Sequence, residues 1–124
     1  MTEDNGTITQ RPWGTYEKLK QEPGIWIKRV EVAPGKRLSL QKHFHRSEHW
    51  VVAFGEGIAR IGKKEIPVRE AMSIDIPVGT VHRLTNTGKD RMVIIEVAFG
   101  HPLTEEDIER LDDDYARHKT DHPA

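Results

Sequence analysis

Short segments in which polar and apolar residues alternate recur along this chain, and glycine-bearing turns separate many of them. IWIKRVEV at 25–32, EHWVVAF at 48–54 and AMSIDI at 71–76 alternate in this way, and comparable segments return about every eight to twelve residues. Alternation places one set of side chains on each face of a strand. Segments of this length and spacing are typical of a β-sandwich or barrel, so we expect an all-β domain.

Composition limits the chain to one globular domain without disulfides or thiolate metal sites. Its 124 residues are enough for one hydrophobic core but not for two. The formal net charge of −1 gives no basic field that would favour nucleic acid or a membrane as a partner. Cysteine is absent, which leaves any metal ion to imidazole, carboxylate and amide ligands.

The two ends of the chain differ from its middle. Residues 1–10 are expected to form a mobile arm, 11–117 the domain and 118–124 a mobile tail. The first segment lacks the apolar core of a secretory signal, and no apolar run approaches the length of a membrane span. We therefore expect a cytoplasmic enzyme or binding protein.

The segment from Thr104 to Arg117 has a different pattern from the rest. Acidic residues come first and a basic residue comes last, which is the order that a helix dipole favours. Ile108, Leu111 and Tyr115 form a narrow apolar stripe at helical spacing. The pattern predicts a short C-terminal helix that is capped by Thr104 and packs on the sheet.

The stretch 35–55 carries the residues with the clearest metal-binding character. Gln41, His43 and His45 occupy alternate positions, so a strand would present all three on one face. Glu48 follows just past a short break in this pattern. Two imidazoles and a carboxylate can hold a transition metal and leave coordination sites open. The alternative is a pair of solvated histidines on an exposed strand face.

The other row of the same stretch is apolar. It holds Leu38, Leu40 and Phe44, interrupted by Lys42. If the polar row lines a cavity, these apolar side chains must be covered by a second sheet or a second subunit. We therefore predict a homodimer.

Two charged residues fall in rows that otherwise look buried. Lys28 shares its row with Trp26 and Val30, and it either reaches an edge of the sheet or lines a polar cavity. Glu96 lies in RMVIIEVA at 91–98, the most apolar segment of the chain, where a carboxylate is costly unless it is paired. Glu96 is therefore an ion-pair partner, a site residue or an exposed edge residue.

His82 adds another imidazole about forty residues beyond the first histidines, in the pattern P-x-G-x-x-H-x-x-x-N at 77–86. This segment and the earlier stretch resemble the two signature motifs of the cupin superfamily. The first motif, G-x(n)-H-x-H-x(n)-E-x6-G, is filled here by Gly35, His43, His45, Glu48 and Gly55. Seven residues separate its first glycine from His43 and two separate His45 from Glu48, and both spacings differ from the commonest ones.

These spacings point to one branch of the superfamily. The chain resembles the C-terminal isomerase domain of type II phosphomannose isomerases, which is often fused to a mannose-1-phosphate guanylyltransferase. SLQ-x-H-x-HR-x-EHW is the specific part of the resemblance, and matching segments occur at 11–19, 28–52, 76–86, 94–97 and 105–115. Without a nucleotidyltransferase half, no sugar-nucleotide step is expected from this chain alone. Ala98 and Pro102 stand where this branch usually has glutamine and tyrosine.

The resemblance implies a fold, a reaction and a metal centre. The fold would be the cupin double-stranded β-helix, a jelly-roll barrel. The reaction would be the metal-dependent interconversion of mannose 6-phosphate and fructose 6-phosphate, which serves polysaccharide biosynthesis. One divalent metal ion is implied, zinc first, with manganese, cobalt, nickel or iron as alternatives. Its expected ligands are His43, His45, Glu48 and His82, with Gln41 as a replacement ligand or as a hydrogen-bond partner of a ligand.

The substrate of such an enzyme would need a proton carrier and cations for its phosphate. Glu96 is the candidate base. Arg46 is the first candidate for the phosphate, because an arginine fork binds two oxygens at once, and Arg37 and Lys28 are further candidates. Two other functions stay open: an iron-dependent cupin oxygenase with the same ligands, and a sugar-binding module without turnover. The residues at 98 and 102 keep the binding module in consideration.

Overall fold

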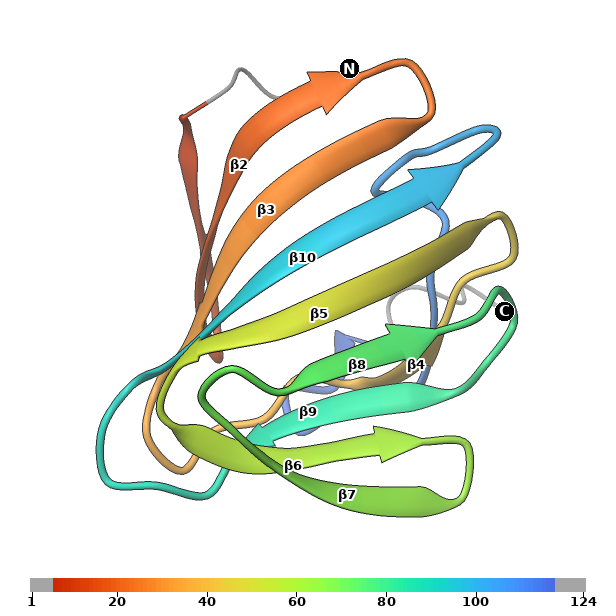
Figure 1. The fold of residues 1–124 in the computed structure, drawn as a ribbon. Helices are drawn as coiled ribbons and strands as arrows, with labels where there is room; N and C mark the ends of the chain where they lie inside the picture. Colours follow the sequence, from red (N-terminus) through yellow and green to blue (C-terminus); the bar gives the residue numbers. More distant parts are fainter. Residues whose placement is uncertain (1–5, 118–124) are drawn as a thin grey trace.

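The computed structural model describes residues 6–117, which form two β-sheets packed face to face (Figure 1). The six-stranded sheet has the order β1-β2-β3-β10-β5-β8, with β1 Ile8–Arg11, β2 Gly14–Glu22, β3 Ile25–Val32, β10 Met92–Gly100, β5 Arg46–Phe54 and β8 Ser73–Ile76. The five-stranded sheet has the order β11-β4-β9-β6-β7, with β11 Glu109–Asp112, β4 Leu40–Lys42, β9 His82–Asn86, β6 Glu56–Ile61 and β7 Lys64–Arg69. This architecture confirms the all-β prediction.

From β4 to β11 the chain passes back and forth between the two sheets. β5, β8 and β10 lie in one sheet, while β4, β6, β7, β9 and β11 lie in the other. All neighbouring strands pair in the antiparallel sense. A chain that winds in this way encloses the space between the sheets, as expected for the predicted double-stranded β-helix. Gly55 makes the crossing from β5 to β6 with a φ of 86°, and a Cβ there would lie 2.7 Å from the Arg91 carbonyl oxygen.

The inner faces of the sheets form the core. In β3 the row from Trp26 to Val32 is buried and the alternate residues are only half-buried, as predicted. In β10 the row from Met92 to Ala98 is buried, although the pairing with β5 has a bulge next to Val93. Each large aliphatic side chain removed from water here contributes about 1.5–3 kcal/mol to the free energy of folding. The same inner rows carry the charged residues of the cavity.

The predicted C-terminal helix is wrong. Residues 104–116 contain no helix; they form a loop and then β11, which pairs with β4. Of the expected apolar stripe, Tyr115 packs on the core and Ile108 lines the cavity, but Leu111 is 43% exposed. The carboxylate of Asp107 accepts hydrogen bonds from two backbone N–H groups in the loop after β4. Strand pairing and these bonds outweigh helix propensity, because they satisfy backbone groups that an uncovered edge would leave without partners.

Part of the predicted mobile N-terminal arm forms a strand. Residues 8–10 fall in the predicted mobile arm but belong to β1, which pairs with β2. Residues 1–5 and the predicted tail 118–124 lie outside the described residues. Across 6–117, no helix is long and apolar enough to cross a membrane.

The apolar row of the stretch 35–55, which was predicted to be covered by a second sheet or subunit, is only partly buried. Leu38 packs against the core, Leu40 is half-buried and Phe44 is 54% exposed. The alternation assumed from Leu38 to Phe44 does not persist, because β4 is only three residues long. The homodimer stays a prediction.

Candidate metal centre and its cavity

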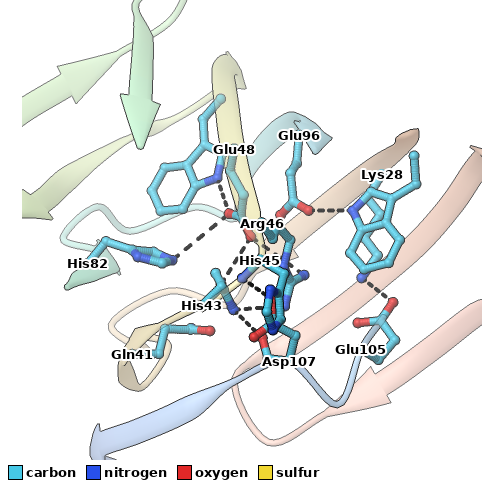
Figure 2. Close-up of polar contacts among 12 residues, drawn as sticks. Lys28, Gln41, His43, His45, Arg46, Glu48, His82, Glu96, Glu105 and Asp107 are labelled. Carbon is cyan, nitrogen blue, oxygen red and sulfur yellow. Dashed lines mark hydrogen bonds and ion pairs between the residues drawn. The ribbon is translucent and has the colours of Figure 1, made fainter. Parts of the chain in front are cut away.

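A cavity of about 120 Å³ lies between the two sheets, with room for several water-sized groups. Both sheets supply its walls, and apolar residues such as Val30 and Ile94 lie among the polar ones. Its buried charged and imidazole side chains are Lys28, His43, Arg46, Glu48, His82 and Glu96. Figure 2 shows these side chains converging from different strands.

Three of these side chains form a cluster with metal-binding geometry. Glu48 comes from β5, His82 from the first position of β9, and His43 from the residue after β4. One ligand atom from each lies within 4.8 Å of the others, and all three residues are buried. The register of the sheet produces this meeting, because Gln41 on β4 lies opposite His82 on β9. Residues far apart in the sequence are thereby held around one point, on strands or directly next to one (Figure 2).

Both imidazoles are held by backbone carbonyl groups through Nδ1. His82 Nδ1 lies 2.8 Å from the Thr80 carbonyl oxygen, and His43 Nδ1 lies 2.6 Å from the Asp107 carbonyl oxygen. A carbonyl oxygen only accepts, so Nδ1 of His82 carries the proton of that ring, and Nε2 of both rings is directed to the cluster. Nε2 of His43 lies 3.1 Å from Glu48 Oε2, and Nε2 of His82 lies 4.0 Å from Glu48 Oε1.

The charge states of Glu48 and His82 suit a divalent cation. Burial alone would raise the pKa of Glu48, but a hydrogen bond with His43 and the positive charge of Arg46 hold that pKa well below its usual range. Burial lowers the pKa of His82, although Glu48 opposes this effect, so His82 is neutral near pH 7. Trp50 supports the carboxylate by donating from Nε1 to Glu48 Oε1 at 2.8 Å. An ionised carboxylate and neutral imidazoles are the forms that bind metals.

Arg46 lies directly behind the cluster. Its Nη2 donates to the Asp107 carbonyl oxygen at 3.0 Å and lies 2.8 Å from His43 Nδ1, and its Nη1 lies 3.6 Å from Glu48 Oε2. The guanidinium also stacks over the ring of Trp26, with 4.9 Å from Cζ to the ring centroid. Arg46 therefore holds both a carboxylate and an imidazole of the cluster in place.

Glu96 lies on the same inner face, one strand away from Glu48. Its Oε2 accepts a hydrogen bond of 2.8 Å from Trp26 Nε1. Burial raises the pKa of Glu96 to about 7, and the negative charge of Glu48 adds to this effect while Lys28 and Arg46 oppose it. A buried carboxyl with a pKa near neutrality can both take up and release a proton, which is a property of catalytic acids and bases.

A family model described as mannose-6-phosphate isomerase C-terminal matches residues 2–113. The chain belongs to this family. The alginate biosynthesis protein AlgA of Pseudomonas aeruginosa is 46% identical over 114 residues, and the xanthan biosynthesis protein XanB of Xanthomonas campestris is 43% identical over 107 residues. A mannose-1-phosphate guanylyltransferase of Klebsiella pneumoniae is 38% identical over 107 residues.

The similarity covers most of this chain but a minor part of these relatives. It spans 92% of the chain and 23% of AlgA, and 86% of the chain and 23% of both XanB and the guanylyltransferase. The chain therefore corresponds to about a quarter of the length of the curated relatives it matches. What is shared is the isomerase C-terminal domain, not the rest of those proteins.

Solved structures support the cupin fold at low sequence identity. The capsular polysaccharide assembling protein CapF of Staphylococcus aureus superposes with a TM-score of 0.76 at 22% identity, over 86% of this chain and 34% of that one. A sugar phosphate isomerase of the cupin superfamily from Silicibacter pomeroyi gives a TM-score of 0.65 at 19% identity, over 71% and 60% of the two chains. These matches confirm the predicted cupin double-stranded β-helix.

Within this isomerase-family domain, Gln41 and not His45 reaches the cavity beside the cluster. Gln41 is buried, lines the cavity and donates from Nε2 to the Ser39 carbonyl oxygen at 3.4 Å. His45 is exposed and lies outside the cluster. The reason is that β4 ends at Lys42, and the bend that follows ends the alternation on which the expectation for His45 depended.

The predicted phosphate-binding residues are divided between the cavity and the surface. Lys28 lines the cavity, which answers whether it reaches an edge or a polar interior. Arg46 is also in the cavity. The side chain of Arg37 is 40% exposed and lies outside the cavity, and its guanidinium donates to both carboxylate oxygens of Asp114 at 2.8 Å. Glu96 is buried on a central strand, so it is not an exposed edge residue.

The two departures from the usual sequence of this branch occupy different settings. Ala98 is fully buried, and it pairs with Trp26 on one side and Glu48 on the other. A glutamine here would place an amide beside the carboxylate of the cluster. Pro102 is exposed in the loop after β10. Ala98 therefore lies next to Glu48, which lines the cavity, whereas Pro102 lies on the surface.

Two residues of the loop after β10 that contact the site could not be recognised in the sequence. Glu105 lines the cavity and pairs with Lys28, and Asp107 binds the loop that carries His43. In the sequence, their acidic run predicts the first turn of a helix. Only the resemblance of 105–115 to the isomerase branch marked this segment, and it did not assign roles to the residues.

We predict that Asp107→Asn weakens metal binding about 10–100-fold, the usual cost of disturbing a residue that orients a ligand. The Asp107 carboxylate accepts from the backbone N–H groups of Phe44 and His45 at 2.8 Å each, and an amide can accept only one of them without presenting a donor to the other. Competition with a chelator of known affinity measures the change. Asp90→Asn, an exposed position away from the cavity, is the control; equal metal affinity in both folded variants would contradict the prediction.

Proposed function

We propose that this protein is a metal-dependent aldose–ketose isomerase that interconverts mannose 6-phosphate and fructose 6-phosphate. The observation that carries the proposal is a single buried cavity in which the His43–Glu48–His82 cluster faces the same space as Glu96 and two cations, Lys28 and Arg46. Such a reaction needs charge stabilisation at two adjacent oxygens, one proton carrier and a site for an anion. The cavity offers a residue for each need.

One divalent metal ion would be held by His43, Glu48 and His82, with Gln41 as the neighbouring amide. When bound, it would act as a Lewis acid toward the sugar oxygens that gain negative charge. Zinc is the first choice for two imidazoles and a carboxylate, and manganese, cobalt, nickel or iron would also accept this donor set. His45 would join the ligands only after a change in the bend that carries it.

Glu96 would carry the proton between the two carbons. Aldose–ketose conversion removes a proton from the carbon next to the carbonyl group and returns one to the former carbonyl carbon, through an enediol. The hydroxyl proton of the neighbouring carbon passes to the former carbonyl oxygen, so that a new carbonyl group forms there. A carboxyl with a pKa near 7 is ionised often enough to accept the proton and binds it firmly enough to return it. The hydrogen bond from Trp26 Nε1 fixes the direction of the Glu96 carboxyl group.

The cavity offers cations for the phosphorylated end of the substrate. Lys28 and Arg46 lie within the cavity, while Arg37 is engaged with Asp114 outside it and would need to leave that partner. Because the domain corresponds to part of the alginate and xanthan biosynthesis proteins, we propose that the product serves polysaccharide biosynthesis in the cytoplasm. We also propose a homodimer, since Val51 and Phe99 expose apolar surface on the outer face of the six-stranded sheet.

The test is a coupled assay of the purified chain with mannose 6-phosphate. We expect turnover that is lost after chelation and restored by zinc, manganese, cobalt, nickel or iron, because the charge at the sugar oxygens needs the bound cation. His82→Ala should be inactive and should contain little metal. His49→Ala, which changes an exposed histidine on the outer face, should behave as the wild type.

Two other outcomes would replace the proposal. Oxygen consumption by an iron-loaded sample without isomerisation would indicate a cupin oxygenase. Binding of mannose 6-phosphate without turnover with any of the five metals, in folded protein, would indicate a sugar-binding module.

A further inference from the structure

Three buried cations surround the indole of Trp26. Lys28 Nζ lies 4.2 Å from its ring centroid, Lys18 Nζ lies 4.6 Å away, and Arg46 approaches as described above. The aromatic face offsets part of the cost of burying an ammonium group, but a full charge in such a place still requires an anionic partner. Arg46 has Glu48 as its partner. The two lysines need another.

That partner is Glu105, which binds both lysines through one oxygen. Glu105 Oε2 lies 2.5 Å from Lys28 Nζ and 3.4 Å from Lys18 Nζ. The lysine side chains are 6% and 2% exposed, whereas that of Glu105 is 30% exposed. The carboxylate therefore lies on the solvent side of the two ammonium groups, and Glu105 and Lys28 both line the cavity. Figure 2 shows the ion pair between Glu105 and Lys28.

The two sides of this contact differ in how firmly they are held. Lys18 and Lys28 lie directly opposite each other on the paired strands β2 and β3. Lys18 is fixed further by donating to Gln21 Oε1 at 2.9 Å. Glu105 comes instead from the loop between β10 and β11, outside any strand. The ammonium pair is preorganised, and the carboxylate is the part that can move aside.

We propose that Lys18 and Lys28 form the subsite for the phosphate of the substrate, and that Glu105 occupies this subsite until the phosphate replaces it. The identification of the anion as a sugar phosphate rests on the proposed function. A phosphate dianion matches two ammonium groups, whereas Glu105 brings one negative charge. Arg46 is thereby assigned to positioning Glu48 and His43 rather than to the phosphate.

The position of the lysines relative to the metal cluster agrees with this assignment. Lys28 pairs across the sheet with Glu96, and Glu96 pairs with Trp50, whose indole binds Glu48. β3 and β5 are two strands apart, about 10 Å at the usual strand spacing. This is the length scale of an extended six-carbon sugar phosphate. Its carbonyl end would lie at the cluster and its phosphate at the lysines, with Glu96 in between.

The experiment is a titration of the full chain with inorganic phosphate at about pH 8, where phosphate is largely a dianion. Excess chelator is present, so that no metal ion can bind the phosphate. If Glu105 occupies the subsite nine-tenths of the time or more, Glu105→Gln binds phosphate at least about tenfold more tightly than the wild type. Lys28→Met added to this variant removes the gain. Glu106→Gln, the same change of charge at the exposed neighbouring residue, gives no gain.

Equal phosphate affinity in the wild type and Glu105→Gln, or an equal gain in Glu106→Gln, would overturn the subsite. If Glu105→Gln does not fold, the wild type still decides, through the NMR signal of the Trp26 indole N–H. Inorganic phosphate should shift this signal while mannose without phosphate should not, and the absence of a shift would overturn the proposal. Phosphate binding needs no turnover, so a protein without isomerase activity could still have the anion subsite. Conversely, isomerase activity without a gain in phosphate affinity in Glu105→Gln would overturn the subsite alone.

Discussion

Glu48→Gln is expected to abolish stable metal binding and, with it, the isomerase activity. Glu48 is the one carboxylate of the cluster, and it lies within reach of both imidazoles and of Arg46. Disturbing a residue that only supports a ligand costs about 10–100-fold in metal affinity, so loss of a ligand charge should cost more than about 100-fold. Metal content after dialysis, measured by mass spectrometry, and competition with a chelator give the size of the loss.

The same variant should also be less stable, because Arg46 would keep its charge in the interior without its carboxylate partner. Breaking a buried ion pair from one side costs about 3–5 kcal/mol. Glu56→Gln, at an exposed position on β6, is the matched control for both measurements. Retention of one metal ion per chain by Glu48→Gln would show that the ligands have been assigned wrongly.

Two histidine variants separate the sequence-based ligand set from the one that the structure brings together. His43→Ala should lose the metal, because its Nε2 lies in the cluster. His45→Ala should retain it, because His45 is exposed and only its backbone N–H is tied to Asp107. A metal loss of equal size in both would restore His45 as a ligand.

Alternation of polar and apolar residues was sufficient to predict the sheets. The inner rows of β3 and β10 follow the period of two, because each strand has one face on the core and one face outside. The same period placed Lys28 and Glu96 in rows that look buried, although it left open whether each side chain lines a cavity or reaches an exposed edge. That question depends on strands distant in the sequence, and only the assembled cavity answers it.

The errors arose where a local pattern competed with tertiary contacts. Between Thr104 and Arg117 the charges and apolar spacing favour a helix, but pairing with β4 and the hydrogen bonds of Asp107 determine the conformation. His45 shares the alternation of Gln41 and His43 in the sequence, but the strand ends before it. Sequence patterns describe one element at a time, while the end of a strand depends on whether a neighbouring strand continues the pairing.

Glu96→Gln is expected to lower the rate of isomerisation about 10²–10⁴-fold, the usual contribution of a positioned acid or base. The amide keeps an oxygen that can accept from Trp26 Nε1, so metal binding should persist while proton transfer is lost. In the wild type the base must be ionised, so kcat/KM should fall about tenfold per pH unit below the pKa of Glu96. That pKa is about 7 without a metal, and a bound cation would lower it, so the decline should begin at or below pH 7.

As the pH rises, the stability of the wild type should fall while its activity rises. The pKa of Glu96 rises from 4.5 to about 7 on folding, so the folded state favours the protonated carboxyl. Its contribution is therefore unfavourable above about pH 4.5, grows as the pH rises and levels off above about pH 7, at on the order of 3 kcal/mol. In chelator, Glu96→Gln should be more stable than the wild type at pH 8, and the difference should shrink to about a quarter of that size at pH 5.

Denaturant unfolding at the two pH values measures this difference, with the exposed Glu65→Gln on β7 as the control. If Glu96→Gln is inactive and its gain in stability over the wild type grows with pH, the Glu96 carboxylate is needed for the reaction and destabilises the folded state. Full activity in Glu96→Gln would instead remove Glu96 from the reaction. The proton would then have to be carried by another group that lines the cavity.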